Sequence, residues 1–272
     1  MLAVAKALLN CRWAGTALCS SLPTHLEQIA YIQTDEKGLP YSVNGMAAAK
    51  GFAFLGYTVR LFHRAELSSL PLTHNTIVVG GMGTVRAALE QLGIHPPSHL
   101  SVPAILQPFL GRESWRTTVR EVRTAGRFPI FLKPYEQAKV FSGQVVKDRD
   151  DLDRLTAPRD GFPSIAEDFP VLAQEPVSFK SEWRVFVVRG VIIGVNFYQG
   201  DPLAFPAAHV IKMTIGAYQQ PPAGYSADFG VTDEGHTLLI ETNDGYSLGH
   251  GALTANLYAE LLQARWLEMT SA

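Results

Sequence analysis

Three oxygen-bearing side chains near the C-terminus have the types and the spacing of a cation site. Asp228 lies in the run SADFGV, and Glu241 and Asn243 lie in the run TLLIETND. If both runs are strands of one antiparallel hairpin, Asp228 faces Glu241, and Asn243 points to the same face two residues further on. Directly opposed side chains are about 5 Å apart at Cβ, where like charges destabilise the sheet unless a cation binds them. Carboxylate and amide oxygens suit Mg²⁺, which takes its other ligands from water and phosphates.

The register of this hairpin decides whether the site exists. The segment TDEGH at 232–236 predicts a tight turn between the two strands. With the turn at Glu234-Gly235, Asp233 faces His236, and counting outward from that pair brings the two carboxylates opposite each other. A turn one residue longer or shorter would separate them onto different faces. The alternative is a solvated strand face with incidental acids; on these residues alone the two interpretations are evenly balanced.

Two lysines and a proline-containing strand end could bind an anion and a planar base. Lys133 closes the apolar run at 129–132, and Lys139 lies in a loop that ends in Phe141-Ser142-Gly143. Such lysines either bind anions or extend into solvent. The run Gln174-Glu175-Pro176-Val177 ends a strand where proline exposes backbone groups. It could hydrogen-bond a base, although a plain strand end is the preferred interpretation when this run is taken alone.

An arginine lies in the middle of an otherwise apolar strand. In EWRVF, strand alternation places Glu182, Arg184 and Phe186 on one face. A guanidinium among apolar neighbours is costly unless it is paired. Arg184 therefore either pairs with Glu182 as a structural salt bridge or binds a phosphate in a bidentate manner.

Two other patterns have a binding interpretation that we do not prefer. Five arginines recur at helical spacing: Arg112, Arg116, Arg120, Arg123 and Arg127. This stripe could contact an anionic substrate or RNA, but a solvated helix face balanced by Glu113 and Glu121 is preferred. The loop Gly80-Gly81-Met82-Gly83 follows a strand and opens a helix, yet Arg86 stands where a dinucleotide fingerprint needs its third glycine. Tight-turn geometry is sufficient to explain the loop.

The elements that carry these residues fall into two differently built halves. Strands at 29–33, 57–63 and 76–79 alternate with helices at 44–55 and from the 80–84 loop to 92, which predicts a parallel sheet covered by helices. A proline-rich linker follows at 95–108. We then expect strands at 128–133, 144–147, 171–175, 182–188 and 191–198, the acidic hairpin, and helices near 210–218 and 253–269. We therefore expect an α/β domain at 27–108 and an α+β domain at 109–272.

The composition is that of an ordinary globular protein. The 272 residues are 47% hydrophobic and 18% charged, with a net charge of −2. No basic field favours nucleic acid, and no apolar run approaches the roughly 20 residues of a membrane span. The two cysteines, Cys11 and Cys19, fit a reducing cytosol, so we expect a cytoplasmic protein. We interpret residues 1–26 as an N-terminal extension, because Asn10-Cys11-Arg12 interrupts the apolar stretch of a secretory signal. Nothing in the sequence excludes a homo-oligomer.

Taken in order, these signals resemble the ATP-grasp superfamily. The chain shows a strand-end lysine, a loop with a second lysine, a Gln-Glu-Pro-Val hinge, an EWRVFV strand and then D…ExN. The resemblance covers roughly residues 126–268, and IETNDGYSLG is close to the ending of some short ATP-grasp proteins. The alternating first half is similar to the pre-ATP-grasp domain of these enzymes. The resemblance implies an ATP site between two α+β lobes with a hinge near residues 174–178, and ATP and Mg²⁺ as cofactors.

The resemblance also implies a role for each matching residue. Lys133 and Lys139 would contact phosphates, Gln174, Glu175 and Val177 would form the adenine hinge, Glu182 would lie near the ribose, and Arg184 near the transferred phosphate. Asp228, Glu241 and Asn243 would hold Mg²⁺. Lys139 and Arg184 would be the catalytic residues. The short segment between Lys133 and the hinge implies an abbreviated first lobe.

Most ATP-grasp enzymes join a carboxylate to an amine or a thiol. The resemblance therefore implies an ATP-dependent carboxylate–amine ligase that acts through an acyl phosphate and releases ADP and phosphate. Its substrates would be small-molecule or peptide carboxylates and amines, bound near the 80–86 loop, the arginine stripe and residues such as Tyr246 and Ser247. Three alternatives stay open: a phosphotransferase of the same fold, an enzyme acting on nucleic-acid ends, and a non-catalytic nucleotide-binding module.

Overall fold

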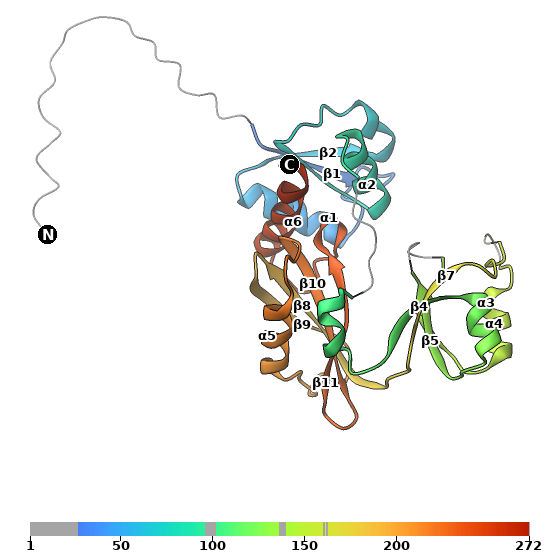
Figure 1. Cartoon of the computed structure of the whole chain (residues 1–272). Coiled ribbons are helices and arrows are strands. Elements are labelled where there is room, and N and C mark those ends of the chain that lie inside the picture. The colour runs from blue at the N-terminus through green and yellow to red at the C-terminus, as the bar shows by residue number, and fades with distance from the viewer. Residues whose placement is uncertain (1–26, 96–101, 136–139, 160, 162, 272) are drawn as a thin grey trace, which may run out of the picture.

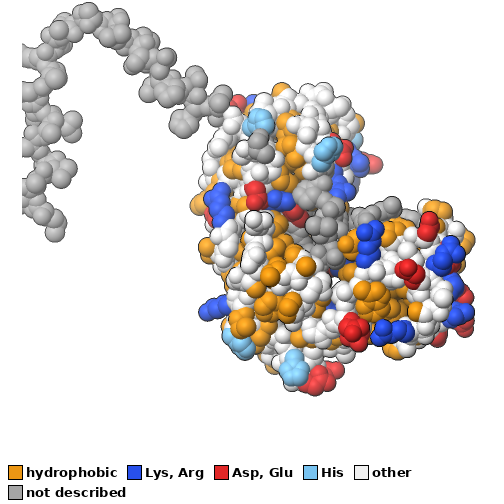
Figure 2. Space-filling view, in the orientation of Figure 1, with side chains coloured by type: hydrophobic (Ala, Val, Ile, Leu, Met, Phe, Trp, Pro, Cys, Tyr) orange, Lys and Arg blue, Asp and Glu red, His pale blue; other side chains and the backbone are white. Residues whose placement is uncertain are grey.

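Three small sheets form the body of the protein (Figure 1). The computed structural model describes residues 27–95, 102–135, 140–159, 161 and 163–271. The expectations for residues 1–26 and for Lys139 lie outside the described residues. Charged side chains of both signs are interspersed on the face shown in Figure 2, which agrees with the near-neutral net charge of −2.

The first sheet is parallel, as the alternation of strands and helices predicted. Its strands are β1 (Ile29–Thr34), β2 (Thr58–His63) and β3 (Thr76–Val79), in the order β2-β1-β3. Helix α1 (Val43–Phe54) connects β1 to β2, and α2 (Met82–Gln91) follows β3. The Ser42 hydroxyl accepts a hydrogen bond from the Gly45 amide and so caps α1.

The core of this sheet continues into the last helix, α6 (Ala255–Thr270). Phe52 of α1 and Trp266 of α6 are both fully buried in one cluster, together with Phe186 from a different sheet. At Gly51 the two helices come so close that an added Cβ would collide with the Ala255 carbonyl oxygen. Residues distant in sequence therefore share one apolar core, and the first sheet is firmly attached to the C-terminal part of the chain.

The second sheet is antiparallel and has the strand order β4-β7-β5-β6. Its strands are β4 (Ser114–Thr118), β5 (Ile130–Pro134), β6 (Gln144–Val146) and β7 (Pro170–Gln174), and two helices, α3 (Val119–Ala125) and α4 (Arg149–Thr156), cover one face. Neither β4 nor α4 was among the predicted elements. The other face of the sheet borders a cavity that the third sheet also lines.

The predicted arginine-bearing helix is wrong. Arg116 lies in β4, and α3 begins only at Val119, because the side chains of Thr118 and Glu121 form a capping box at that point. Pairing with β7 holds the preceding residues in an extended conformation. The five arginines therefore do not share a helix face, and Arg123 forms ion pairs with Asp153 and Glu167.

The third sheet has the order β11-β10-β8-β9 and is entirely antiparallel. Its strands are β8 (Phe179–Val188), β9 (Val191–Gly200), β10 (Gly224–Thr232) and β11 (Thr237–Asp244), and α5 (Ala208–Ala217) covers one face. Helix α6 lies on part of the other face, where a Cβ at Gly224 would collide with the Leu261 carbonyl oxygen. The rest of that face carries Arg184 and Asp228, which line the cavity.

Candidate nucleotide and metal site

A cavity of about 440 Å³ lies between the second and third sheets. Eight of the residues predicted for the site line it: Lys133, Gln174, Glu175, Val177, Glu182, Arg184, Asp228 and Glu241. The ninth described site residue, Asn243, is hydrogen-bonded to two of these eight. Residues spread over more than a hundred positions of the sequence therefore meet at one place.

Strand β5 supplies one wall of the cavity through simple alternation. Ile130 and Leu132 are buried against α3 and α4, so Phe131 and Lys133 point to the opposite face, into the cavity. The Lys133 ammonium lies 2.9 Å from a carboxylate oxygen of Glu241 on β11, and this contact joins the two sheets across the cavity. Burial acts to raise the pKa of Glu241, but the positive charge of Lys133 and the hydrogen bonds to the carboxylate together outweigh it, so the pKa is lowered overall.

Arg184 and Asp228 form the second ion pair of the cavity. They lie opposite each other on β8 and β10, and the Arg184 Nε and Nη2 donate to the two carboxylate oxygens at 2.8 and 2.6 Å. Arg184 therefore pairs with Asp228 rather than with Glu182. Burial raises the pKa of the Asp228 carboxyl, and the two hydrogen bonds from the guanidinium act in the opposite direction.

The pairing of Asp228 with Glu241 is confirmed, although the register of the turn differs from the prediction. Near the turn the pairs are Val231 with Thr237 and Phe229 with Leu239, one residue away from the predicted register. A β-bulge after Asp228 then inserts Ile240 as an extra residue in β11 and brings Asp228 opposite Glu241. Without this bulge the two carboxylates would lie on different faces.

The bulge also places two consecutive side chains in the cavity, which a regular strand cannot do. Ile240 and Glu241 both line it. The apolar side chains of Phe131 and Ile240, from opposite sheets, thus border the same space as the charged groups. The alternation in FPIFLKP could have pointed to Phe131, but no sequence signal indicated Ile240, because its orientation depends on the bulge.

The amide of Asn243 completes the acidic cluster. Its nitrogen donates to Asp228 at 3.3 Å and to Glu241 at 3.1 Å, so this amide connects both predicted carboxylate ligands of the metal. Two carboxylates and one amide form a hard oxygen donor set that fits Mg²⁺. No group of three Asp, Glu, His or Cys side chains that could hold a metal occurs within the described part of the chain. The donor set therefore depends on the asparagine.

The hinge residues follow the end of β7 at the edge of the cavity. The Glu175 amide donates to the Glu113 carbonyl at 3.2 Å, and the Glu175 carboxylate accepts from the Glu113 amide at 2.9 Å. The buried Gln174 side chain donates to the Ser114 hydroxyl and accepts from Arg112. Because the Gln174 amide is engaged on both sides, any contact between this side chain and a base would have to replace an existing hydrogen bond.

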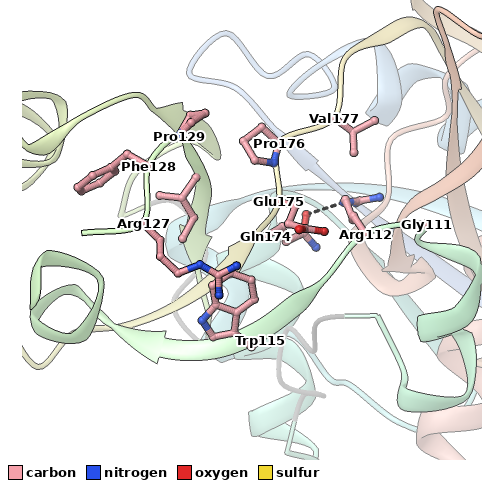
Figure 3. Close-up of a pocket in the computed structure, with 11 residues that line it drawn as sticks. Gly111, Arg112, Trp115, Arg127, Phe128, Pro129, Gln174, Glu175, Pro176 and Val177 are labelled. Carbon is pink, nitrogen blue, oxygen red and sulfur yellow. Dashed lines mark hydrogen bonds between the residues drawn. The ribbon is translucent and has the colours of Figure 1, made fainter. Parts of the chain in front are cut away.

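A second cavity, of about 590 Å³, lies on the other side of the hinge (Figure 3). It is bordered by Pro176 and by Arg127, whose guanidinium carbon lies 5.7 Å from the centre of the Trp115 ring. Arg112 lies between this hinge-side cavity and the cavity that holds the acidic cluster, and it lines both. Burial lowers the pKa of Arg112 to about 10, which leaves it charged at neutral pH.

The glycine loop and the predicted substrate residues lie near the first sheet. A Cβ at Gly80 would lie 2.5 Å from the Gln33 side-chain oxygen, and the Gly81 amide donates to that oxygen at 3.0 Å. Close packing against Gln33 thus explains the glycine at position 80. The Arg86 Nε donates to the Tyr246 hydroxyl at 3.1 Å, which joins the helix after the loop to the segment that follows Asn243.

Comparison with solved structures shows the fold. The chain is similar to a RimK domain protein ATP-grasp from Sphaerobacter thermophilus DSM 20745 (18% identity, TM-score 0.51, covering 86% of this chain and 99% of that one). It is also similar to a D-alanine–D-alanine ligase from Bacillus anthracis complexed with ATP (15%, 0.53, 89% and 96%). A third similar structure is the D-cycloserine synthetase DcsG (13%, 0.54, 89% and 99%). No curated protein matches the chain. No described helix is long and apolar enough to cross a membrane.

The sequence itself matches a family model. The model describes an ATP-grasp domain, the second family of its clade, and it matches residues 109–261. That range contains every residue of the candidate site, the whole second sheet and the whole third sheet. The chain therefore belongs to the ATP-grasp superfamily.

Proposed function

We propose that the protein is an ATP-dependent carboxylate–amine ligase that works through an acyl-phosphate intermediate and releases ADP and phosphate. The observation that carries the proposal is the interlocked cluster in which Lys133 contacts Glu241 and Arg184 contacts Asp228. It lies in one cavity with the hinge residues Glu175 and Val177. The cluster brings together two cations suited to phosphates and two carboxylates suited to a metal ion.

Each charged group has a role in this proposal. Asp228, Glu241 and Asn243 would hold Mg²⁺, which when bound neutralises phosphate oxygens and helps to align them. Lys133 and Arg184 would exchange their present carboxylate partners for phosphate oxygens. The Arg184 fork is suited to a phosphoryl group because its two donors already reach two oxygens of one group. We retain Lys139 as a further phosphate-binding candidate by the resemblance alone.

The reaction is balanced without a side-chain nucleophile. A substrate carboxylate oxygen attacks the γ-phosphorus, and the bond from that phosphorus to the bridging oxygen of ADP breaks. The amine nitrogen then attacks the acyl carbon, its proton is lost to solvent, and phosphate leaves. The main physical task is to bring anions together, so positioning and charge neutralisation supply most of the catalysis.

The domain organisation belongs to the same proposal. Residues 27–108 would form the pre-ATP-grasp-like domain, and residues 109–272 the ATP-grasp domain, whose two subdomains would enclose the nucleotide with a hinge near 174–178. The placement of Phe131 and Ile240 on opposite walls of the cavity supports a base-binding slot between the two sheets. We also propose a cytoplasmic location and small-molecule or peptide substrates.

The test is a screen of carboxylates and amines for stimulated release of ADP. With the correct carboxylate, hydroxylamine should trap a hydroxamate while ADP accumulates, even without the natural amine. An ¹⁸O label in the carboxylate should appear in the released phosphate. Release of AMP and pyrophosphate would exclude this mechanism and favour action on nucleic-acid ends. Stimulation by hydroxyl acceptors without a hydroxamate would favour a phosphotransferase, and binding without turnover a non-catalytic module.

A further inference from the structure

One buried guanidinium is attached directly to the bulge that forms the acidic cluster. Arg112 donates from Nη1 to the Leu239 carbonyl oxygen at 3.0 Å and from Nη2 to the Ile240 carbonyl oxygen at 3.1 Å. Ile240 is the extra residue of the bulge, and Glu241 follows it. Arg112 therefore contacts the backbone of both residues that precede the predicted metal ligand.

Two consecutive carbonyls can meet one guanidinium because the strand is bulged. In a regular strand, successive carbonyls point to opposite edges, so one side chain at one edge reaches only alternate residues. Strand β11 is an edge strand, with β10 on its other side. At the bulge the carbonyls of Leu239 and Ile240 both turn to the side where Arg112 lies, and the guanidinium satisfies them.

The guanidinium is itself held in place by other groups. Its Nε donates to the Gln174 side chain at 3.2 Å, shown as the dashed line in Figure 3, and Nη1 also donates to the Leu110 carbonyl at 2.9 Å. The ring of Phe179 lies against it, with the guanidinium carbon 5.9 Å from the ring centre. Arg112 thus connects the end of β7, where the hinge begins, to the bulge of β11.

We propose that Arg112 is a positioning residue that holds the β11 bulge and thereby keeps Glu241 opposite Asp228 and Ile240 in the cavity. This inference rests on the proposed function for the identity of the ligands, and on this chain's own contacts for the role of Arg112. The four hydrogen bonds leave the guanidinium no need to contact a ligand. Loss of Arg112 would let β11 relax toward the register of its turn, in which the two carboxylates lie on different faces.

The test compares Arg112→Met and Arg112→Lys with the control Arg60→Met. Methionine keeps much of the apolar stem and removes every donor, whereas lysine keeps the charge but cannot span two carbonyls and Gln174 together. Arg60 lies on β2 in the first sheet, does not line the cavity, and contacts Glu27 at 3.4 Å. Three quantities are measured: Mn²⁺ affinity in the presence of ADP, ADP affinity in EDTA, and hydrogen exchange of residues 237–244.

Arg112→Met should weaken Mn²⁺ binding about tenfold or more, change metal-free ADP affinity much less, and speed exchange selectively in residues 237–244. Arg112→Lys should lie between Met and wild type, and Arg60→Met should behave as wild type. Mn²⁺ affinity within about twofold of wild type for Arg112→Met, or faster exchange spread evenly over all three sheets, would overturn the inference. If wild type itself binds no Mn²⁺ with ADP, the proposed function fails, while the exchange measurement still decides whether Arg112 holds the bulge.

Discussion

Arg184 on β8 and Asp228 on β10 lie directly opposite each other, and the guanidinium grips both carboxylate oxygens at 2.8 and 2.6 Å. Both side chains are largely buried, with exposed fractions of 19% and 13%. A pair of this kind costs much to break, because loss of either partner leaves the other charged in a poorly solvated place. The cluster that we assign to phosphate and metal binding is therefore also part of the structure of the third sheet.

Asp228→Asn and Glu241→Gln should both abolish ATP turnover, but only the first should clearly reduce stability. Asp228→Asn leaves the buried Arg184 without a counter-charge, and we expect a loss of about 1–3 kcal/mol in the free energy of unfolding. Glu241→Gln should cost less than about 1 kcal/mol, because Lys133 is 24% exposed and can turn to water. Urea denaturation and ADP release measure the two effects. Near-normal ATP consumption by either variant would refute the metal assignment.

Arg184→Lys and Lys133→Met should separate catalysis from binding. Arg184→Lys keeps the charge but loses the two-pronged contact, so kcat should fall about 10–100-fold with a smaller change in nucleotide affinity. Lys133→Met should weaken nucleotide binding about tenfold, because one cation is lost from the phosphate site. Steady-state kinetics and nucleotide titration measure both parameters. Wild-type kcat in Arg184→Lys would indicate that this arginine is purely structural.

Removal of divalent metal should remove most of the stabilisation by nucleotide. At a nucleotide concentration about one hundred times Kd, binding adds about 2.7 kcal/mol to stability, which appears as a higher Tm. We expect this increase with ADP and Mg²⁺, and a much smaller one with ADP and EDTA. Glu241→Gln is the matched control and should behave with Mg²⁺ as wild type does with EDTA. An equal increase in EDTA would show that the acidic cluster does not bind metal with the nucleotide.

Gly143→Ala should weaken nucleotide binding without unfolding the protein. An added Cβ would lie 2.6 Å from the tip of the Phe131 ring and 3.3 Å from the Lys133 Cβ. The ring can yield only by moving, and both it and Gly143 line the cavity. We expect nucleotide affinity to fall about three- to tenfold with a change in Tm of a few degrees. Gly56→Ala is a poor control because of its positive φ, so Gly216→Ala, which has open space, serves instead.

Arg265→Met should be among the most destabilising changes in the last helix. Arg265 on α6 donates to both oxygens of Asp244 at 2.7 and 2.6 Å and to Glu268 at 2.6 Å. Asp244 directly follows Asn243, so this ion pair fixes the end of β11 against α6. We expect a loss of about 2–4 kcal/mol, because a mostly buried carboxylate is left unpaired. Thermal or urea unfolding measures it, and the double variant Arg265→Met, Asp244→Asn should recover part of the loss.

The sequence by itself determined the residue types of the site and the alternation that presents them. Lys133 follows a strand whose buried positions alternate, and Arg184 shares a strand face with Glu182, so local period-two patterning was sufficient to orient both. The parallel first sheet was likewise predictable, because βαβ connections have few topological solutions. The family resemblance was contained in the order of these local signals.

Tertiary structure decided what depends on contacts between distant segments. The turn after Thr232 alone would set a register that separates Asp228 from Glu241, and the bulge at Ile240 restores their pairing. That bulge is contacted by Arg112, more than a hundred residues earlier, which periodicity had placed on a helix that does not form. Local propensity could not reveal either feature, because both depend on hydrogen bonds between backbone groups and side chains far apart in the sequence.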